Sequence, residues 1–272
     1  MHLAFNQFEL SGESESSKGS HAGKASKDKQ TILILHGLFG SKRNWQSIAR
    51  QLSEHFRVFT LDLRNHGESE HSETMSYQDM ADDVLQFISE HDLEEVSIVG
   101  HSMGGKVAMQ MALGQPEIIK RLVIIDIAPV QYQHSFDDLI SSLDALPLDQ
   151  ISSRQEADEY LKASVQPESL RQFLLQNLYK LETGFSWRFN LKAIRSSIDE
   201  LMDFHTSRHD MSYQKSVLFL KGEKSDYIKH LYERQIFSFF PRALFITLEG
   251  AGHWLHAENP DFVVNEIGKF IK

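Results

Sequence analysis

One serine of the chain lies in a pattern that is typical of catalytic nucleophiles. The sequence GHSMGG, residues 100–105, follows the apolar run Val96–Val99 and contains the pattern G-x-S-x-G with Ser102 at its centre. In this pattern the serine lies on a sharp strand-to-helix turn, which exposes its hydroxyl group. Gly100 and Gly104 have no Cβ, so the helix can pass close to the strand. The spacing therefore predicts that Ser102 is a nucleophile.

A histidine near the C-terminus is the best candidate for the base that activates this serine. A serine hydroxyl attacks poorly at neutral pH, so it needs a general base, usually a histidine held by a carboxylate. The chain has 14 histidines, and only their positions distinguish them. His253 lies in the glycine-flanked sequence GAGHW, residues 250–254, directly after the apolar run Leu244–Leu248. We expect His253 to be the base, whereas His256 is a weaker alternative because it lies nearer the final helix.

Two aspartates are candidates for the carboxylate that holds the histidine. Asp126 follows the apolar run Leu122–Ile125, and Asp226 comes shortly after the run Val217–Leu220. Both lie at the carboxyl ends of predicted strands, where open α/β sheets bind their ligands. Either side chain could reach the far nitrogen of His253, so the residues alone leave the choice open. The other aspartate would then be a helix cap or a loop residue.

Two backbone amides are expected to stabilise the negative charge that develops on the substrate. One is the N–H of Met103, the residue after the nucleophile. The other is the N–H of Leu38 in the sequence HGLFG, residues 36–40, which follows the apolar run Thr31–Leu35. The polar sequence DLRNHGES, residues 62–69, is expected to hold the neighbouring loops in place.

Short apolar runs alternate with stretches of helical periodicity along most of the chain. The predicted strands lie at about 3–10, 31–35, 58–63, 96–99, 122–125, 217–220 and 244–248. Apolar residues recur at helical spacing at 45–52, 80–88, 106–113, 227–239 and 261–271. This alternation predicts an α/β fold with a mostly parallel central sheet and helices on both of its faces.

One long stretch interrupts the alternation. Residues 130–213 have helical periodicity throughout and no convincing strand, so they predict a helical lid inserted into the core. The core is then formed by residues 1–129 and 214–272, and the 272-residue length suits a single domain with such an insertion. Residues 11–29 are rich in Ser, Gly, Lys and Glu and predict a flexible polar loop within the core.

The lid is rich enough in apolar side chains to line a pocket for an acyl group. About half of these residues are expected to pack the lid instead. The candidate substrate-binding residues of the lid are Phe173, Leu174, Leu178, Phe185 and Trp187. Those near the predicted catalytic loops are Phe39, His101 and Trp254.

Composition excludes several classes of function. The formal charge of −10 opposes binding to nucleic acid and to anionic membranes, and no apolar run is long enough for membrane insertion. The absence of cysteine excludes disulfides, thiolate zinc sites and cysteine nucleophiles. Together with an N-terminus that has no secretory pattern, it favours a cytoplasmic protein. The predicted chemistry requires no cofactor and no metal.

The motifs resemble those of a known superfamily. Residues 36–40, 62–69, 100–105 and 252–253 occur in the order and spacing of the α/β-hydrolases. A closer resemblance is to the small bacterial carboxylesterases of the YbfF type. It rests on the segments 36–41, 63–67, 125–130, 171–178 and 187–191.

This resemblance implies an α/β-hydrolase fold with a lid and the hydrolysis of short- to medium-chain acyl esters, with acyl thioesters as possible further substrates. It also favours Asp126 as the acid, because the matching aspartate has that role in the YbfF-type enzymes. The chain departs from that pattern at Asp226, where many other α/β-hydrolases have their acid.

The motifs and the resemblance together predict a serine esterase that acts on a small-molecule ester or thioester. The alternatives on the same three side chains are an acyl-CoA thioesterase and a hydrolase of carbon–carbon bonds. A ligand-binding signalling protein of the same fold is a further alternative, which slow turnover would favour. The oligomeric state is left open.

Overall fold

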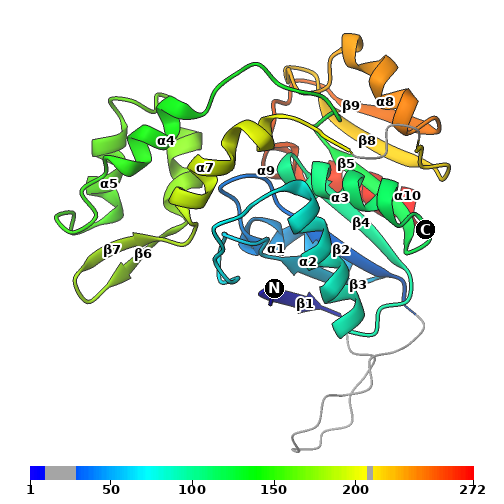
Figure 1. Cartoon of the computed structure of the whole chain (residues 1–272), viewed down its shortest axis with the longest axis horizontal. Coiled ribbons are helices and arrows are strands. Elements are labelled where there is room, and N and C mark those ends of the chain that lie inside the picture. The colour runs from blue at the N-terminus through cyan, green and yellow to red at the C-terminus, as the bar shows by residue number, and fades with distance from the viewer. Residues whose placement is uncertain (10–28, 207–210) are drawn as a thin grey trace, which may run out of the picture.

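A seven-stranded sheet forms the centre of the molecule in the computed structural model, which describes residues 1–9, 29–206 and 211–272. The strand order is β1-β3-β2-β4-β5-β8-β9 (Figure 1). Only β1 is antiparallel to its neighbour, so the predicted mostly parallel sheet is confirmed. The strands are β1 (Phe5–Phe8), β2 (Thr31–Leu35), β3 (Arg57–Leu61), β4 (Val96–His101), β5 (Ile119–Ile125), β8 (Val217–Gly222) and β9 (Ala243–Leu248).

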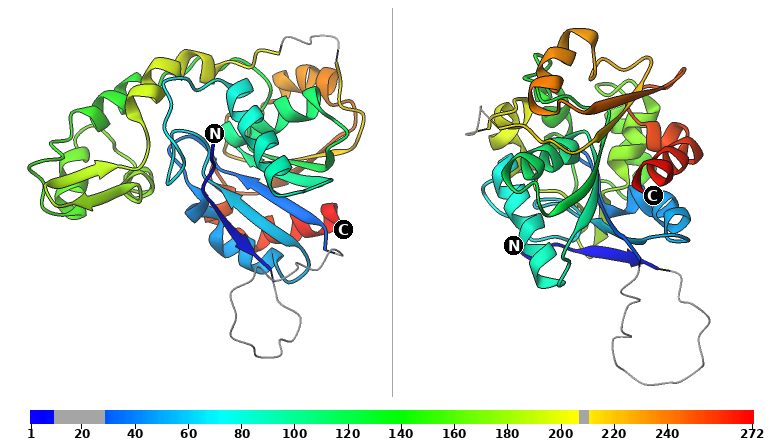
Figure 2. Two further views of the ribbon diagram at one scale, coloured as in Figure 1. Left: turned by 60° about the horizontal axis from the view of Figure 1, so that its bottom comes forward. Right: turned by 90° about the vertical axis from the view of Figure 1, so that its right-hand side faces the viewer.

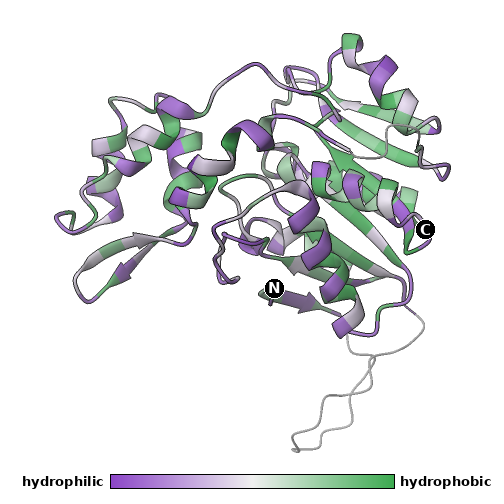
Figure 3. Ribbon diagram, in the orientation of Figure 1, coloured by the Kyte–Doolittle hydropathy of each residue, from purple (hydrophilic) through white to green (hydrophobic). Residues whose placement is uncertain are grey.

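Helices cover both faces of the sheet (Figure 2, right). Successive strand residues point to opposite faces, so each central strand contributes to two separate apolar clusters. The central strands are accordingly mostly hydrophobic in Figure 3. One face packs against α1 (Gln46–Leu52) and α10 (Pro260–Ile271). The other packs against α2 (Tyr77–Glu90), α3 (Met103–Gly114) and α8 (Glu233–Phe239). The short helices are η1 (Lys42–Trp45), η2 (His230–Tyr232) and α9 (Leu255–Glu258).

The parallel strands bring the predicted functional loops to one edge of the sheet. Strands β2, β4, β5, β8 and β9 are consecutive neighbours and run in the same direction. The chain segments that follow them therefore leave the sheet side by side. These segments carry Leu38, Ser102, Asp126, Asp226 and His253, respectively.

The turn at Ser102 requires glycine on both sides. Ser102 has φ 52° and ψ −121°, a conformation that residues with a side chain rarely adopt. A Cβ atom on Gly100 would lie 2.4 Å from the carbonyl oxygen of Gly104. A Cβ atom on Gly104 would lie 2.4 Å from the carbonyl oxygen of Leu35. Both atoms would collide with backbone, so helix α3 can pass this close to β2 and β4 only because these residues are glycines.

The close approach of Gly104 to the backbone of β2 predicts that larger residues at this position destabilise the protein. Gly104→Ala is expected to lower the free energy of unfolding by about 3 kcal/mol or more, because neither backbone element can move away from the new methyl group. Gly114→Ala at the end of the same helix is the control. A Cβ atom there meets nothing within 4 Å, so stability should rise or stay within about 1 kcal/mol. Urea unfolding of both variants tests the difference, and equal effects would contradict it.

The lid differs from the sequence-based prediction in one respect. It contains the helices α4 (Asp137–Asp144), α5 (Arg154–Leu161), α6 (Glu168–Leu175) and α7 (Leu191–Met202), and it projects from one end of the core (Figures 1 and 2). However, β6 (Leu178–Leu181) and β7 (Gly184–Trp187) form an antiparallel hairpin, so the prediction of no strand here is wrong. Four-residue strands are too short to show a period of two clearly. The turn consists of Glu182 and Thr183, and Gly184, which follows it, has φ 112°.

Two further expectations concern the polar loop and membrane insertion. The polar loop predicted at 11–29 lies outside the described residues except for Lys29. In the part of the chain that is described, every helix is too short or too polar to span a bilayer.

Candidate active site

Ser102 and His253 line the same cavity, which has a volume of about 250 Å³. Of the residues predicted to bind substrate or the oxyanion, Leu38, Phe39, His101, Phe173 and Trp254 also line it. Sequence reasoning missed the apolar contributions of Trp45, Phe136, Leu139, Leu170 and Tyr227. Phe136 and Leu139 begin the lid directly after the loop that follows β5, a position that could have suggested a role at the site.

His253 is held by Asp126. Its Nδ1 lies 2.8 Å from Asp126 Oδ2, and this hydrogen bond leaves Nε2 to act as the base. The Asp126 side chain is completely buried, and it also accepts hydrogen bonds from Ser225 Oγ and from the Gly222 N–H at 3.2 Å. These donors fix the orientation of the carboxylate.

The other candidate acid, Asp226, lies at the protein surface. Its side chain is 87% exposed and pairs with Lys229 at 2.9 Å. The loop that carries Asp226 nevertheless contributes to the site through its neighbours. Ser225 binds Asp126, and the Tyr227 ring stacks on the His253 ring with a centroid distance of 4.1 Å. The loop therefore orients the histidine from two sides.

The amides of Leu38 and Met103 are available to a ligand. Among the described residues, the Leu38 N–H has no acceptor. The Met103 N–H begins α3, where the first amides have no helical acceptor. The amides around them are engaged, because the Phe39 N–H donates to His66 Nε2 and the Gly104 N–H to the His36 carbonyl oxygen. Leu38 and Met103 line one cavity together with Ser102, which is the arrangement that an oxyanion site requires.

Two buried histidines connect the Leu38 loop to the loop after β3. His36 Nε2 accepts a hydrogen bond from the Leu63 N–H at 3.0 Å, and His66 Nε2 accepts one from the Phe39 N–H at 3.2 Å. Burial lowers the pKa of His66 to about 3 and also lowers the pKa of His36. Both rings are therefore neutral at pH 7 and can accept these bonds. The pair holds the Leu38 amide in place.

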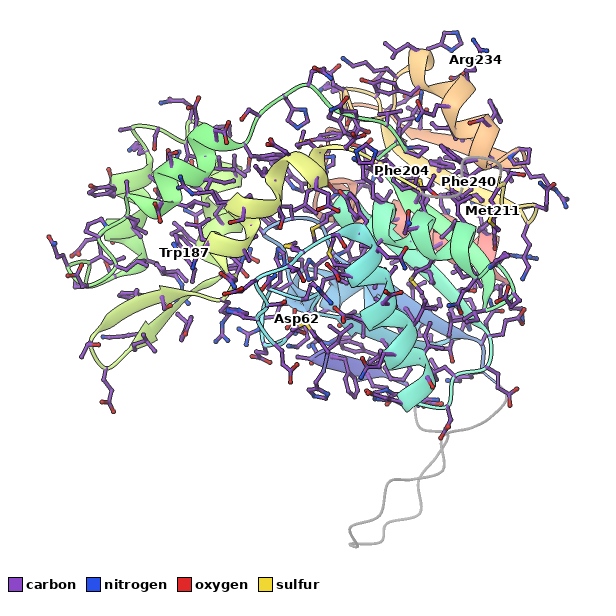
Figure 4. All side chains as sticks on the ribbon, viewed as in Figure 1. Asp62, Trp187, Phe204, Met211, Arg234 and Phe240 are labelled. Atoms are coloured by element: carbon purple, nitrogen blue, oxygen red, sulfur yellow. The ribbon has the colours of Figure 1, made fainter. Side chains whose placement is uncertain are left out.

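Four predicted substrate-binding residues do not reach the cavity. Trp187 stacks on Phe189 at a centroid distance of 5.0 Å, and Figure 4 shows it within the lid. The hairpin turns three of these side chains, those of Leu178, Phe185 and Trp187, toward the interior of the lid, whereas Leu174 is buried in helix α6. All four are buried there: Leu174, Leu178, Phe185 and Trp187.

His256 lies at the cavity but in a different environment from His253. Its ring stacks on Trp45 at 4.5 Å, and burial lowers its pKa to about 3. A ring that resists protonation this strongly is a poor general base at neutral pH. Among the residues described, no group of three or more His, Asp and Glu side chains is arranged to hold a metal ion.

Comparison with known proteins identifies the family. The alpha/beta hydrolase fold family matches residues 30–260. The chain belongs to the α/β-hydrolases. An α/β-hydrolase named sn-1-specific diacylglycerol lipase ABHD11, from Xenopus laevis, is 39% identical over 89% of this chain and 79% of its own.

The resemblance to the YbfF-type enzymes is also confirmed. Esterase YbfF of Escherichia coli is 32% identical, and the match covers 88% of this chain and 92% of that protein. A solved structure described as a marine microorganism esterase is 36% identical, covers 98% of both chains and has a TM-score of 0.89. These α/β-hydrolases share the fold over nearly the full length of the chain.

Proposed function

We propose that the protein is a serine esterase that hydrolyses carboxylic esters through Ser102, His253 and Asp126. The observation that carries this assignment is the contact of His253 Nδ1 with the buried Asp126 carboxylate, in a cavity that Ser102 also lines. Family membership and the relatives named esterases support a carboxylic ester hydrolase.

In the first half of the reaction, His253 Nε2 removes the proton from Ser102 Oγ, which attacks the ester carbonyl carbon. The oxyanion that forms accepts hydrogen bonds from the N–H groups of Leu38 and Met103, each worth about 10²–10³ in rate. The intermediate collapses when His253 gives its proton to the leaving alcohol. This step leaves the acyl group on Ser102.

In the second half, water replaces the alcohol. His253 takes a proton from the water, whose oxygen attacks the acyl carbon, and the same two amides stabilise the second oxyanion. Collapse breaks the bond to Ser102, and His253 returns the proton to Ser102 Oγ. The products are one carboxylic acid and one alcohol. Asp126 remains ionised throughout and stabilises the charged imidazole ring.

Covalent labelling tests the proposed nucleophile. A fluorophosphonate probe is expected to add once per chain, at Ser102, and to abolish hydrolysis of p-nitrophenyl esters in proportion to labelling. Peptide mass spectrometry locates the adduct. Esterase activity that persists after complete labelling of Ser102, or a label on a different serine, would contradict the assignment.

A substrate panel distinguishes the proposed activity from its alternatives. Short-chain oxygen esters such as p-nitrophenyl acetate should be hydrolysed faster than acyl-CoA thioesters, vinylogous diketones and the long-chain oxygen ester diacylglycerol. A preference for thioesters or diketones would favour the other hydrolases on the same side chains. Slow turnover of every compound, together with ligand-dependent stabilisation, would favour a binding protein. The cytoplasmic location stays a prediction from the sequence.

A further inference from the structure

A second, smaller cavity meets the first one at Ser102. Its volume is about 40 Å³, and four residues line both cavities: Leu38, Ser102, Phe136 and Tyr227. Beyond the serine, the small cavity is bounded by Met103 and Lys106 of α3 and by Leu201 and Met202 at the end of lid helix α7. A substrate whose carbonyl carbon lies at Ser102 therefore has two unequal spaces on its two sides.

The position of His253 decides which part of the substrate lies in each space. The leaving alcohol must be within reach of His253 Nε2, which gives it a proton. His253 lines the large cavity and not the small one, whereas Met103 lines only the small one. The alcohol therefore lies in the large cavity, and the acyl group extends past the Met103 amide into the small one.

We infer that the small cavity is the acyl subsite and that the C-terminal turn of α7 is the wall that limits acyl length. This inference rests on the proposed esterase function. It goes beyond that function because it assigns a chemical class of substrate: short, uncharged acyl groups on bulky apolar alcohols.

The wall is fixed to the nucleophile helix by Lys106. Lys106 Nζ donates to the carbonyl oxygens of Asp203, Met202 and Leu201 at 2.7, 3.2 and 3.5 Å. These are carbonyl groups at the end of α7, where a cation is favourable. The Tyr77 hydroxyl donates to the Leu201 carbonyl oxygen at 2.6 Å. The end of the lid helix therefore has a set position relative to Ser102.

The same contacts make the subsite unsuitable for a charged acyl group. Lys106 Nζ has at most three N–H donors, and all three of its carbonyl contacts lie in the wall itself. The rings of Tyr132 and Tyr77 cover Nζ at 4.9 and 5.5 Å. Burial lowers the pKa of Lys106 to about 7, which weakens its attraction for an anion above that pH. No donor of Lys106 is left for a carboxylate, so dicarboxylic half-esters should be poor substrates.

The volume of the small cavity limits the length of the acyl group that it can hold. A water-sized group needs roughly 10–15 Å³ measured in this way, so about 40 Å³ holds about three non-hydrogen atoms beyond the reacting carbon. Acyl groups of roughly two to four carbons fit this space. The large cavity, at about 250 Å³, has room for a ring or a medium-length chain.

An acyl series on one alcohol tests the assignment. The wild-type protein should hydrolyse p-nitrophenyl acetate and butyrate well, and kcat/KM should fall by about tenfold or more at hexanoate and again at octanoate. Met202→Ala shortens the wall and should raise the hexanoate-to-acetate ratio of kcat/KM by about tenfold. Leu201→Ala is a second variant of the wall, and it should change this ratio in the same direction. Ile198→Ala removes a buried side chain from the same helix without touching either cavity, so it should leave the profile unchanged.

An alcohol series provides the reciprocal test. Acetates of ethanol, hexanol and benzyl alcohol should be hydrolysed with increasing efficiency as the alcohol fills the large cavity. Efficient hydrolysis of ethyl octanoate but not of hexyl acetate would overturn the assignment, and so would an unchanged chain-length profile in folded Met202→Ala or Leu201→Ala. If both variants fail to fold, the wild-type series alone decides. Absence of Ser102-dependent hydrolysis of any ester would instead contradict the proposed function.

Discussion

Ser102→Ala is expected to lower kcat for p-nitrophenyl acetate by about 10⁶, because no other group can form the acyl-enzyme. The loss should appear in kcat more than in KM, since both cavities that bind the substrate remain. The fold should be intact. Among the described residues, no hydrogen bond of the Ser102 side chain supports the structure, and alanine retains the Cβ atom.

Ser102→Gly is the matched control for the strain at this position. It removes the same hydroxyl, so its activity should be as low as that of the alanine variant. Because φ is 52°, glycine also relieves a conformation that costs about 1–3 kcal/mol. The glycine variant should therefore be at least as stable in urea as the alanine variant. Activity near the wild-type level in either variant, in samples shown by mass spectrometry to carry the substitution, would refute the role of Ser102.

Asp126→Asn is expected to lower kcat by about 10⁴, the size of effect seen when the acid of a serine triad becomes an amide. An amide nitrogen facing His253 Nδ1 favours the tautomer whose Nε2 carries a proton, which cannot act as the base. The substitution also removes the negative charge that stabilises the protonated ring. The buried position and the donors from Ser225 and Gly222 are specific for a carboxylate.

Asp226→Asn is the control for the second prediction. The Asp226 carboxylate is exposed, and surface ion pairs such as the one with Lys229 contribute little to stability. Both kcat and stability should therefore stay close to the wild-type values. Steady-state kinetics of the two variants at pH 8 compare them directly. A large loss of activity in Asp226→Asn, with Asp126→Asn still active, would reverse the assignment.

The sequence predicted the main elements of the site because short motifs specify the local backbone conformation. G-x-S-x-G after an apolar run specifies a turn with small neighbours, and the close approach at Gly100 and Gly104 agrees with that expectation. The order of apolar runs likewise predicted the parallel sheet, because strands buried on both faces have continuous apolar sequences. In each case the information lies within a few consecutive residues.

The lid was predicted less well. The sequence showed a break in the strand–helix alternation between β5 and β8, but it did not show the hairpin at 178–187. Runs of four residues fit a helix and a strand about equally, and tertiary packing decides between them. The same packing turned Phe185 and Trp187 toward the lid core and left Phe173 in the cavity.

By itself, then, the sequence determined which residue types lie at the ends of which strands, and with them the candidate nucleophile, its candidate histidine and two candidate acids. Only the tertiary structure decided which aspartate contacts His253, because that contact joins residues 127 positions apart. Asp126 and Asp226 both lie in loops that follow neighbouring strands, β5 and β8. What separates them is the path of two loops, which leaves one carboxylate buried against the imidazole ring and the other in solvent. The division into two unequal cavities has the same origin, since Lys106 and α7 meet only in the folded chain.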